Sequence, residues 1–205
     1  MIKKLSILLI GLGMIITAWN AVDWWNQSRV VSYEPELKSE VKASPVSAEV
    51  HKPSPDPHSV SAETSDDYEK GEDIGELTIP KLGKRYPVYY GSDENTLTKG
   101  VGMYDTPYTN LPSEGGHTAL AGHRETTFVG LDQLAKGDSI YLTENQMEYE
   151  YVIQSIWITD AEDRSVIVPE TSSTLTLTTC YPFDFIGSAP DRFIVQAELA
   201  AQNEF

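Results

Sequence analysis

The feature that most constrains the fold is a series of short, partly alternating apolar segments between Ile74 and about Ala200. Glycine, proline, asparagine and aspartate, which favour turns, separate these segments. Two short helices are predicted at Glu94–Lys99 and Thr127–Leu134. The predicted strands are Gly75–Ile79, Tyr86–Tyr90, Thr118–Gly122, Ser139–Thr143, Met147–Thr159, Thr174–Thr179 and Arg192–Leu199. Many short strands with few helices predict an all-β domain, either a closed barrel or a sandwich.

An uncharged segment from Leu5 to Val22 follows two lysines at the N-terminus. As a helix, its 18 residues would measure about 27 Å, close to the roughly 30 Å hydrocarbon core of a bilayer. We therefore expect a single-pass membrane anchor at residues 5–25, with residues 1–4 in the cytoplasm and the remainder outside. A cleaved signal peptide is disfavoured because no alanine near the end of the segment has a small residue two positions before it. A buried helix is the third alternative.

Residues 26–73 are expected to form a disordered extracytoplasmic linker. From Ser32 to Asp73 the sequence is rich in serine, proline and acidic residues and poor in large apolar ones. Such a composition cannot bury enough apolar surface to offset the loss of chain entropy. His51 and His58 are interpreted as bystanders within this linker. The catalytic or binding domain is then expected at residues 74–205.

Charge and cysteine content exclude several kinds of function. The net charge of −16 argues against electrostatic binding of nucleic acid, which needs clustered lysine and arginine. The single cysteine, Cys180, excludes an intrachain disulfide and a zinc site built from several thiolates.

Cys180 lies at the end of a predicted strand. Because successive strand residues face opposite sides, Leu175 and Leu177 share one face. The other face carries Thr174, Thr176, Thr178 and Cys180. A cysteine at the end of the polar face favours a reactive thiol, although a packed, inert cysteine is the commoner case in proteins.

Two further kinds of residue are candidates for the same site. In the last strand Arg192 heads the more polar face, and its local pattern alone also fits a solvated surface arginine. Of His117 and His123, His123 lies where its strand should end, which favours it as the catalytic one. A single cysteine with a histidine elsewhere is a candidate nucleophile and base.

Three short motifs resemble those of one enzyme family, the sortases. LTLTTC at Leu175–Cys180 resembles the sortase signature TLxTC, and ALAGHR at Ala119–Arg124 resembles the strand-end histidine motif. DRFIV at Asp191–Val195 resembles the strand that carries the sortase arginine. The three motifs occur in the family's order, and the resemblance spans Ile74–Leu199. An N-terminal anchor and linker also fit it.

The resemblance implies a closed eight-stranded β-barrel with short helices and a membrane-anchored cysteine transpeptidase of the Gram-positive cell wall, a thiol protease of the hydrolase class. Cys180 would attack the threonine carbonyl of an LPXTG-like sorting signal on a secreted protein and form a thioacyl-enzyme. An amine of a peptidoglycan precursor or cross-bridge would then resolve that intermediate. His123 would act as acid and base, and Arg192 would stabilise the oxyanion or position the signal. Arg124 is a rival cation, which strand alternation should turn away from His123.

Class D is the subclass that the chain resembles best, with class A next. The connection from about Asp160 to Ser173 is too short for the helix inserted there in class B. The chain has neither an Asp-Pro-aromatic lid nor a second hydrophobic span, which disfavours class C. No cofactor or metal site is predicted. Calcium modulation, known in class A, stays open, because the acidic candidates cannot be placed as ligands; they are Glu125, Glu162, Asp163 and Glu170.

Two other functions are compatible with parts of the sequence. The chain could be an anchored peptide-binding module, or an inactive relative that only docks peptides. It could also be another cysteine and histidine enzyme of the wall, such as a papain-like peptidase, in which the cysteine precedes the histidine. Here the histidine comes first.

Overall fold

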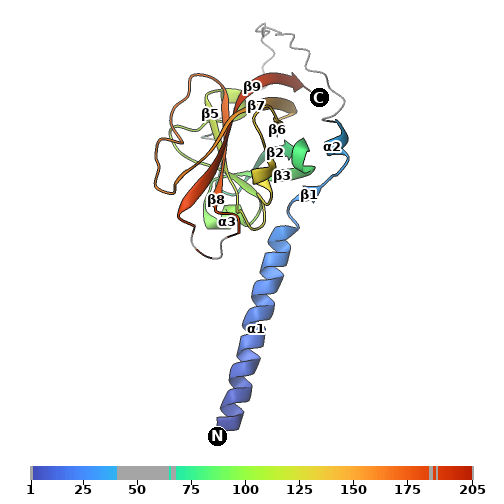
Figure 1. Cartoon of the computed structure of the whole chain (residues 1–205), viewed down its shortest axis with the longest axis vertical. Coiled ribbons are helices and arrows are strands. Elements are labelled where there is room, and N and C mark those ends of the chain that lie inside the picture. Colours follow the sequence, from blue (N-terminus) through green and yellow to red (C-terminus); the bar gives the residue numbers. More distant parts are fainter. Residues whose placement is uncertain (1, 41–64, 66–67, 185–186, 188, 205) are drawn as a thin grey trace.

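The computed structural model describes residues 2–40, 65, 68–184, 187 and 189–204. Helix α1 (Ile2–Ser28) extends away from a β-barrel that contains the later elements (Figure 1). The described residues after the first strand include two short α-helices, α2 (Leu37–Glu40) and α3 (Glu94–Leu97). They also include 3-10 turns at Pro80–Leu82, Pro112–Glu114 and Leu131–Gln133. The strands are β1 (Ser32–Tyr33), β2 (Asp73–Ile79), β3 (Lys84–Tyr90), β4 (Val101–Met103), β5 (His117–Ala121), β6 (Ser139–Glu144), β7 (Met147–Asp160), β8 (Thr174–Tyr181) and β9 (Asp191–Glu204).

Eight of the described strands close into a ring. Their order is β3-β2-β6-β7-β9-β8-β5-β4, and β4 returns to pair in parallel with β3. Strands β5 and β8 are also parallel, whereas β8 and β9 are antiparallel. This arrangement confirms the predicted closed eight-stranded barrel and excludes the sandwich.

Each of the seven predicted strands is present, most of them slightly longer than predicted. Strand β4 was not predicted, because it has only three residues and Gly100 and Gly102 favour a turn there. The predicted helix at Thr127–Leu134 is wrong in extent, since only a 3-10 turn forms at Leu131–Gln133. The predicted helix at Glu94–Lys99 forms as the shorter α3.

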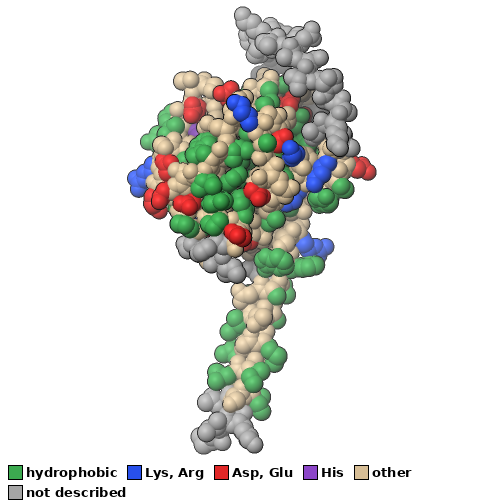
Figure 2. All heavy atoms as spheres, in the orientation of Figure 1, with side chains coloured by type: hydrophobic (Ala, Val, Ile, Leu, Met, Phe, Trp, Pro, Cys, Tyr) green, Lys and Arg blue, Asp and Glu red, His purple; other side chains and the backbone are tan. Residues whose placement is uncertain are grey.

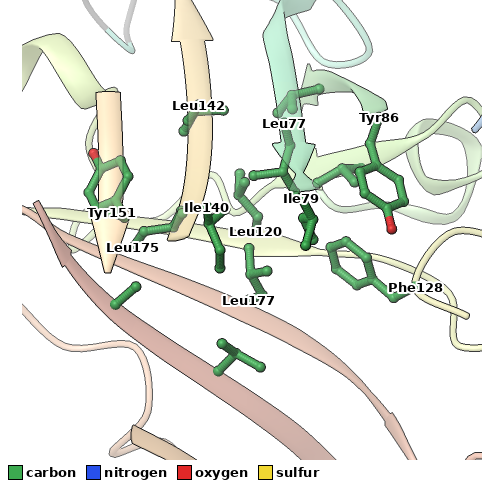
Figure 3. Close-up of a cluster of buried hydrophobic side chains, with 14 of the residues drawn as sticks. Leu77, Ile79, Tyr86, Leu120, Phe128, Ile140, Leu142, Tyr151, Leu175 and Leu177 are labelled. Atoms are coloured by element: carbon green, nitrogen blue, oxygen red, sulfur yellow. The ribbon is translucent and has the colours of Figure 1, made fainter. Parts of the chain in front are cut away.

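The barrel interior is filled by apolar side chains from opposite walls (Figure 3). Leu175 and Leu177 of β8 are both fully buried there, as their alternation predicts. Phe128, from the loop after β5, packs edge-on against Tyr86 with ring centroids 5.7 Å apart. The core therefore fixes β8 and the loop after β5, which carry the candidate cysteine and histidine.

The predicted disorder of the linker is wrong at both of its ends. Ser32 and Tyr33 pair with β3, and Leu37 is only 9% exposed, so the chain after α1 packs on the barrel edge. At the other end, Tyr68 packs against Tyr90 with centroids 6.2 Å apart. At these two ends, a few backbone hydrogen bonds and single buried apolar side chains order the chain despite its polar composition. The rest of the predicted linker, including His51 and His58, lies outside the described residues.

Helix α1 covers the segment predicted as a membrane anchor. Apolar side chains on it are exposed, among them Ile7, Met14 and Trp19, and hydrophobic groups occur along the helix in Figure 2. Within the described part of the chain, no helix combines the length and the apolar character required to cross a membrane.

Candidate active site

Cys180 and Arg192 lie directly opposite each other on neighbouring strands. They are register partners in the antiparallel pair β8–β9. Directly opposed residues project from the same face of a sheet, with Cβ atoms about 4.5–5.5 Å apart. Both side chains are half-buried, and Cys180 is a free thiol. The predicted nucleophile and cation are therefore neighbours, although they are 12 positions apart in sequence.

His123 follows the strand on the other side of β8, just beyond the last paired residues. Strand β5 runs parallel to β8, with Ala121 level with Thr178, and the same register continued for two residues would bring His123 level with Cys180. Two hydrogen bonds hold the strand ends together at this point. The Gly122 N–H donates to the Thr178 carbonyl (3.2 Å), and the Thr179 hydroxyl donates to the Gly122 carbonyl (2.7 Å). Histidine, cysteine and arginine thus meet at one end of three adjacent strands.

The turn that follows β5 fixes the backbone of His123. The Phe128 N–H donates to the His123 carbonyl (2.8 Å), and the Phe128 ring is fully buried in the core. Gly122 makes this packing possible, because a Cβ at that position would lie 2.7 Å from the Phe128 ring. Residues 122–128, here called the histidine turn, are therefore held from the core side.

Glu94 is a charged neighbour of His123 that the sequence analysis missed. Its Oε1 lies 3.9 Å from Nε2 of His123, whose side chain is 26% exposed. Glu94 begins α3, and the carboxylate of the N-cap Asp93 accepts hydrogen bonds from the Asn95 and Thr96 N–H groups. The Thr96 hydroxyl also donates to Asp93 and is the largest cause of the lowered pKa of Asp93. The capping residue before a predicted helix start was the only available signal for this contact.

His117 has a different environment from His123. It is 1% exposed, and both ring nitrogens are hydrogen-bonded. Nδ1 lies 2.7 Å from the Val168 carbonyl oxygen, and Nε2 lies 2.8 Å from the Thr176 hydroxyl. His117 therefore ties the loop between β7 and β8 to the barrel. These contacts favour His123 as the catalytic histidine.

The threonine face of β8 is buried, although its side chains are polar. Thr174, Thr176 and Thr178 are all less than 5% exposed. Their hydroxyls are paired within the protein, for instance Thr178 with the Tyr104 hydroxyl at 2.9 Å. His117 of β5 contacts Thr176 on this face, Tyr104 contacts Thr178, and Cys180 at the end of the face is half-buried.

Arg192 donates hydrogen bonds to its own loop. Its Nη1 lies 3.0 Å from the Asp191 carbonyl and 3.4 Å from the Ala189 carbonyl. These contacts hold the Arg192 guanidinium against the start of β9, and its permanent positive charge is the kind of group that can stabilise an oxyanion. Arg124, the rival cation, is 3% exposed, and its guanidinium donates to Glu125 and to the carbonyls of Pro182 and Gly187. The contacts of Arg124 favour Arg192 as the cation of the site.

The acidic candidates for calcium do not gather at one place. Glu125 pairs with Arg124, and Asp163 accepts hydrogen bonds from Ser165 and Thr159, chiefly the former, which lower its pKa. Throughout the described residues, no group of three or more histidine, cysteine, aspartate or glutamate side chains could hold a metal ion.

Comparison with known proteins identifies relatives of the barrel. The Sortase domain family model matches residues 77–200. Sortase D of Bacillus subtilis (strain 168) is 41% identical over 128 residues, which are 62% of this chain and 64% of that protein. Sortase A of Bacillus anthracis is 30% identical over 135 residues, 64% of this chain and 61% of that protein. These alignments therefore cover somewhat less than two thirds of each relative.

Solved structures share the same barrel. The catalytic domain of B. anthracis SrtD superposes with a TM-score of 0.60 at 47% identity, covering 72% of this chain and 98% of that one. A Clostridium perfringens Sortase D5 transpeptidase gives a TM-score of 0.59 at 29% identity, covering 65% of this chain and 82% of that one. Since the family model matches more than half of the sequence, and the barrel places the motif residues together, the chain belongs to the sortase family.

Proposed function

We propose that this protein is a cysteine transpeptidase that cleaves an LPXTG-like sorting signal after its threonine and transfers the cleaved protein to a cell-wall amine. The observation that carries the proposal is the register of β8 and β9, which sets Cys180 opposite Arg192. The register of β5 and β8, continued two residues past its last pair, supports His123 as the third member. The likeness to Sortase D supports a class D enzyme, with class A as the nearest alternative.

The three side chains divide the first half of the reaction among them. The Cys180 thiolate adds to the threonine carbonyl of the signal and forms a tetrahedral oxyanion. Arg192 donates hydrogen bonds to that oxyanion or to the signal beside it. The imidazolium of His123 gives its proton to the leaving amine as the peptide bond breaks. A thioester between Cys180 and the threonine remains.

The second half reverses these roles. An amine of a peptidoglycan precursor or cross-bridge attacks the thioester carbonyl, and neutral His123 accepts the proton that the amine loses. Collapse of the new tetrahedral intermediate forms an amide and releases the Cys180 thiolate. No cofactor takes part, since the nucleophile, acid and cation are all side chains of the chain. The partners are thus secreted proteins bearing the signal and the wall amine.

We also propose that α1 anchors the barrel to the cell membrane, with the N-terminus in the cytoplasm and the barrel outside. The uncharged sequence Leu5–Val22 and the exposed apolar side chains of α1 support this location, as do the two preceding lysines. The test is extraction of membranes with alkaline carbonate. The full chain should stay with the membrane and a chain lacking residues 1–28 should not; release of the full chain would contradict an anchor.

Incubation with a small library of LPXTX peptides and several amines tests the proposed activity. The wild-type protein should cleave a subset of peptides after threonine and yield the corresponding amides. The Cys180→Ala variant is the matched control and should give neither product. Binding of peptides without cleavage, together with a thiol no more reactive than a buried one, would instead support a peptide-binding module.

A further inference from the structure

The side chain of Arg124 links the histidine turn to the loop after the nucleophile. Arg124 is 3% exposed, although it carries a permanent charge and has no role in the proposed chemistry. Its Nη1 donates to the Pro182 carbonyl at 3.0 Å, and its Nη2 donates to the Gly187 carbonyl at 2.7 Å. Its Nε pairs with Glu125. A buried arginine is rare unless its donors are satisfied in this way.

The position of these contacts connects the three segments that carry the site. The pairing of β5 with β8 ends at Ala121 and Gly122, so His123 lies just beyond the strand ladder. Arg124 is the next residue. Pro182 comes two residues after Cys180, and Gly187 belongs to the same β8–β9 loop, which leads to Arg192. The guanidinium therefore joins the backbone beside the histidine to the loop between the cysteine and the arginine.

Aromatic rings hold the same loop from a different side. Tyr181, Phe183 and Phe193 form a cluster with ring centroids 5.2–6.3 Å apart. Phe193 is 8% exposed and belongs to the core, and the other two rings pack against it. The rings therefore hold the start of the β8–β9 loop against the core. The hydrogen bonds from Arg124 then fix this loop relative to the histidine turn.

We propose that Arg124 is a positioning residue for transpeptidation, which acts by keeping His123 level with Cys180. This inference rests on the proposed function of the site. Three different nitrogens of one planar group contact three separate acceptors, two of them carbonyl oxygens at different points of the loop. A lysine ammonium has a single nitrogen and cannot span all three acceptors. Position 124 therefore requires arginine for full activity.

The test compares three variants of the full chain with wild type, using a peptide that the wild-type protein cleaves. Arg124→Met should lower kcat at least 10-fold, while KM for the peptide changes less than about 3-fold. Arg124→Lys should lie between Arg124→Met and wild type. Because the Glu125 side chain is about half exposed, Glu125→Gln should fold normally. It should give the smallest loss of kcat among the three variants. Arg85→Met is the matched control, because Arg85 is an arginine of β3 that forms ion pairs with Glu34 and Glu76. It should leave kcat unchanged.

A double-mutant cycle separates positioning of His123 from a general structural role. In a His123→Ala background, the loss caused by Arg124→Met or Arg124→Lys should shrink to less than about 2-fold, measured by mass spectrometry over long incubations. The same loss in both backgrounds, or a kcat unaffected by all three variants, would overturn the inference. If the wild-type protein cleaves no peptide, the proposed function fails first, and the inference falls with it.

Discussion

His123 and His117 differ in their surroundings more than in their sequence context. His117 has both ring nitrogens bonded inside the protein, whereas His123 is partly exposed beside the strand end that carries Cys180. His123→Ala should therefore lower the cleavage rate by on the order of 100-fold or more, the usual effect of losing a general acid and base. His117→Ala should lower stability by about 1–3 kcal/mol, because it leaves Thr176 and the Val168 carbonyl without that partner.

Cleavage rates corrected for the folded fraction, together with urea unfolding, check this pair of variants. Activity per folded molecule should survive in His117→Ala. If His117→Ala were inactive while folded and His123→Ala were active, the roles of the two histidines would have to be exchanged.

Arg192 differs from lysine in the shape of its charged group. The planar guanidinium can keep its hydrogen bonds to the Asp191 and Ala189 carbonyls and still present donors to an oxyanion, which a single ammonium cannot do. Arg192→Lys should lower the acylation rate by roughly 100-fold, the effect of losing one oxyanion donor. Rapid-quench measurement of thioester formation tests this, with circular dichroism as the control for folding. A near-normal rate would return Arg192 to the class of surface arginines.

The short segment β1–α2 links α1 to the barrel edge. Besides the β1–β3 pairing, the Glu34 N–H donates to the Gly83 carbonyl at 2.7 Å, and Arg85 forms an ion pair with Glu34 at 3.1 Å. Leu37 is the buried apolar anchor of this segment. Leu37→Ala should lower the free energy of unfolding by about 2 kcal/mol, near the lower limit for a core leucine because the site lies at an edge.

Urea unfolding of Leu37→Ala and of the volume-conserving Leu37→Met tests this docking. The methionine variant should lose less than about 1.5 kcal/mol. Peptide cleavage by both should match wild type, since Leu37 lies outside the candidate site. Equal stability of wild type and Leu37→Ala would mean that β1 and α2 do not contribute to the fold in solution.

Sequence patterns predicted the elements that have enough residues to show a period. Alternation of Leu175 and Leu177 with threonines located β8 and its inward face correctly. Strand β4 is too short for such a pattern. Ser32–Tyr33 becomes a strand because Lys84 and Arg85 of β3 lie outside the part of β3 that pairs with β4. The buried Thr176 and Thr178 contact His117 and Tyr104, which are distant in sequence, and alternation along one strand cannot reveal such contacts.

At the scale of the whole molecule, the motifs predicted which residues form the candidate site, whereas the barrel topology explains why they meet. Cys180 and Arg192 are 12 residues apart, yet they become direct neighbours only because β8 and β9 pair in this register. The contacts of Arg124 with Pro182 and Gly187 have no sequence signal, because they end on backbone carbonyls. Every residue has a backbone carbonyl, so the sequence does not show which of them accept a hydrogen bond from an arginine.

The folded molecule should lose stability in alkaline solution. Burial raises the pKa of Tyr86, and burial with a lesser effect of Glu144 raises the pKa of Tyr149 to about 12. Tyrosine in the unfolded chain ionises near about 10. The unfolded state therefore loses these protons first as the pH rises. The contribution of the two tyrosines to the free energy of unfolding is fully present below about pH 10 and is lost as the pH rises towards 12.

Tyr86→Phe tests the tyrosine contribution. Within the described residues, the buried Tyr86 hydroxyl has no hydrogen-bond partner. Its removal should leave the free energy of unfolding at pH 7 unchanged or raise it by about 1 kcal/mol, and should reduce the loss above pH 10. Thermal melts at pH 7, 9, 10 and 11 give both values. A large loss of stability at pH 7 would show that the hydroxyl has a stabilising partner in solution.

The central claim is that Cys180 forms a thioester with the threonine of a sorting signal, aided by His123 and Arg192. The most direct measurement is intact-protein mass spectrometry after brief acid quench of the protein with a cleavable LPXTX peptide and no added amine. The account predicts an adduct with the mass of the acyl fragment up to threonine, located on Cys180 by digestion and discharged when an amine is added. It predicts no adduct on Cys180→Ala. Cleavage by Cys180→Ala at the wild-type rate, or an adduct on any other residue, would contradict the account.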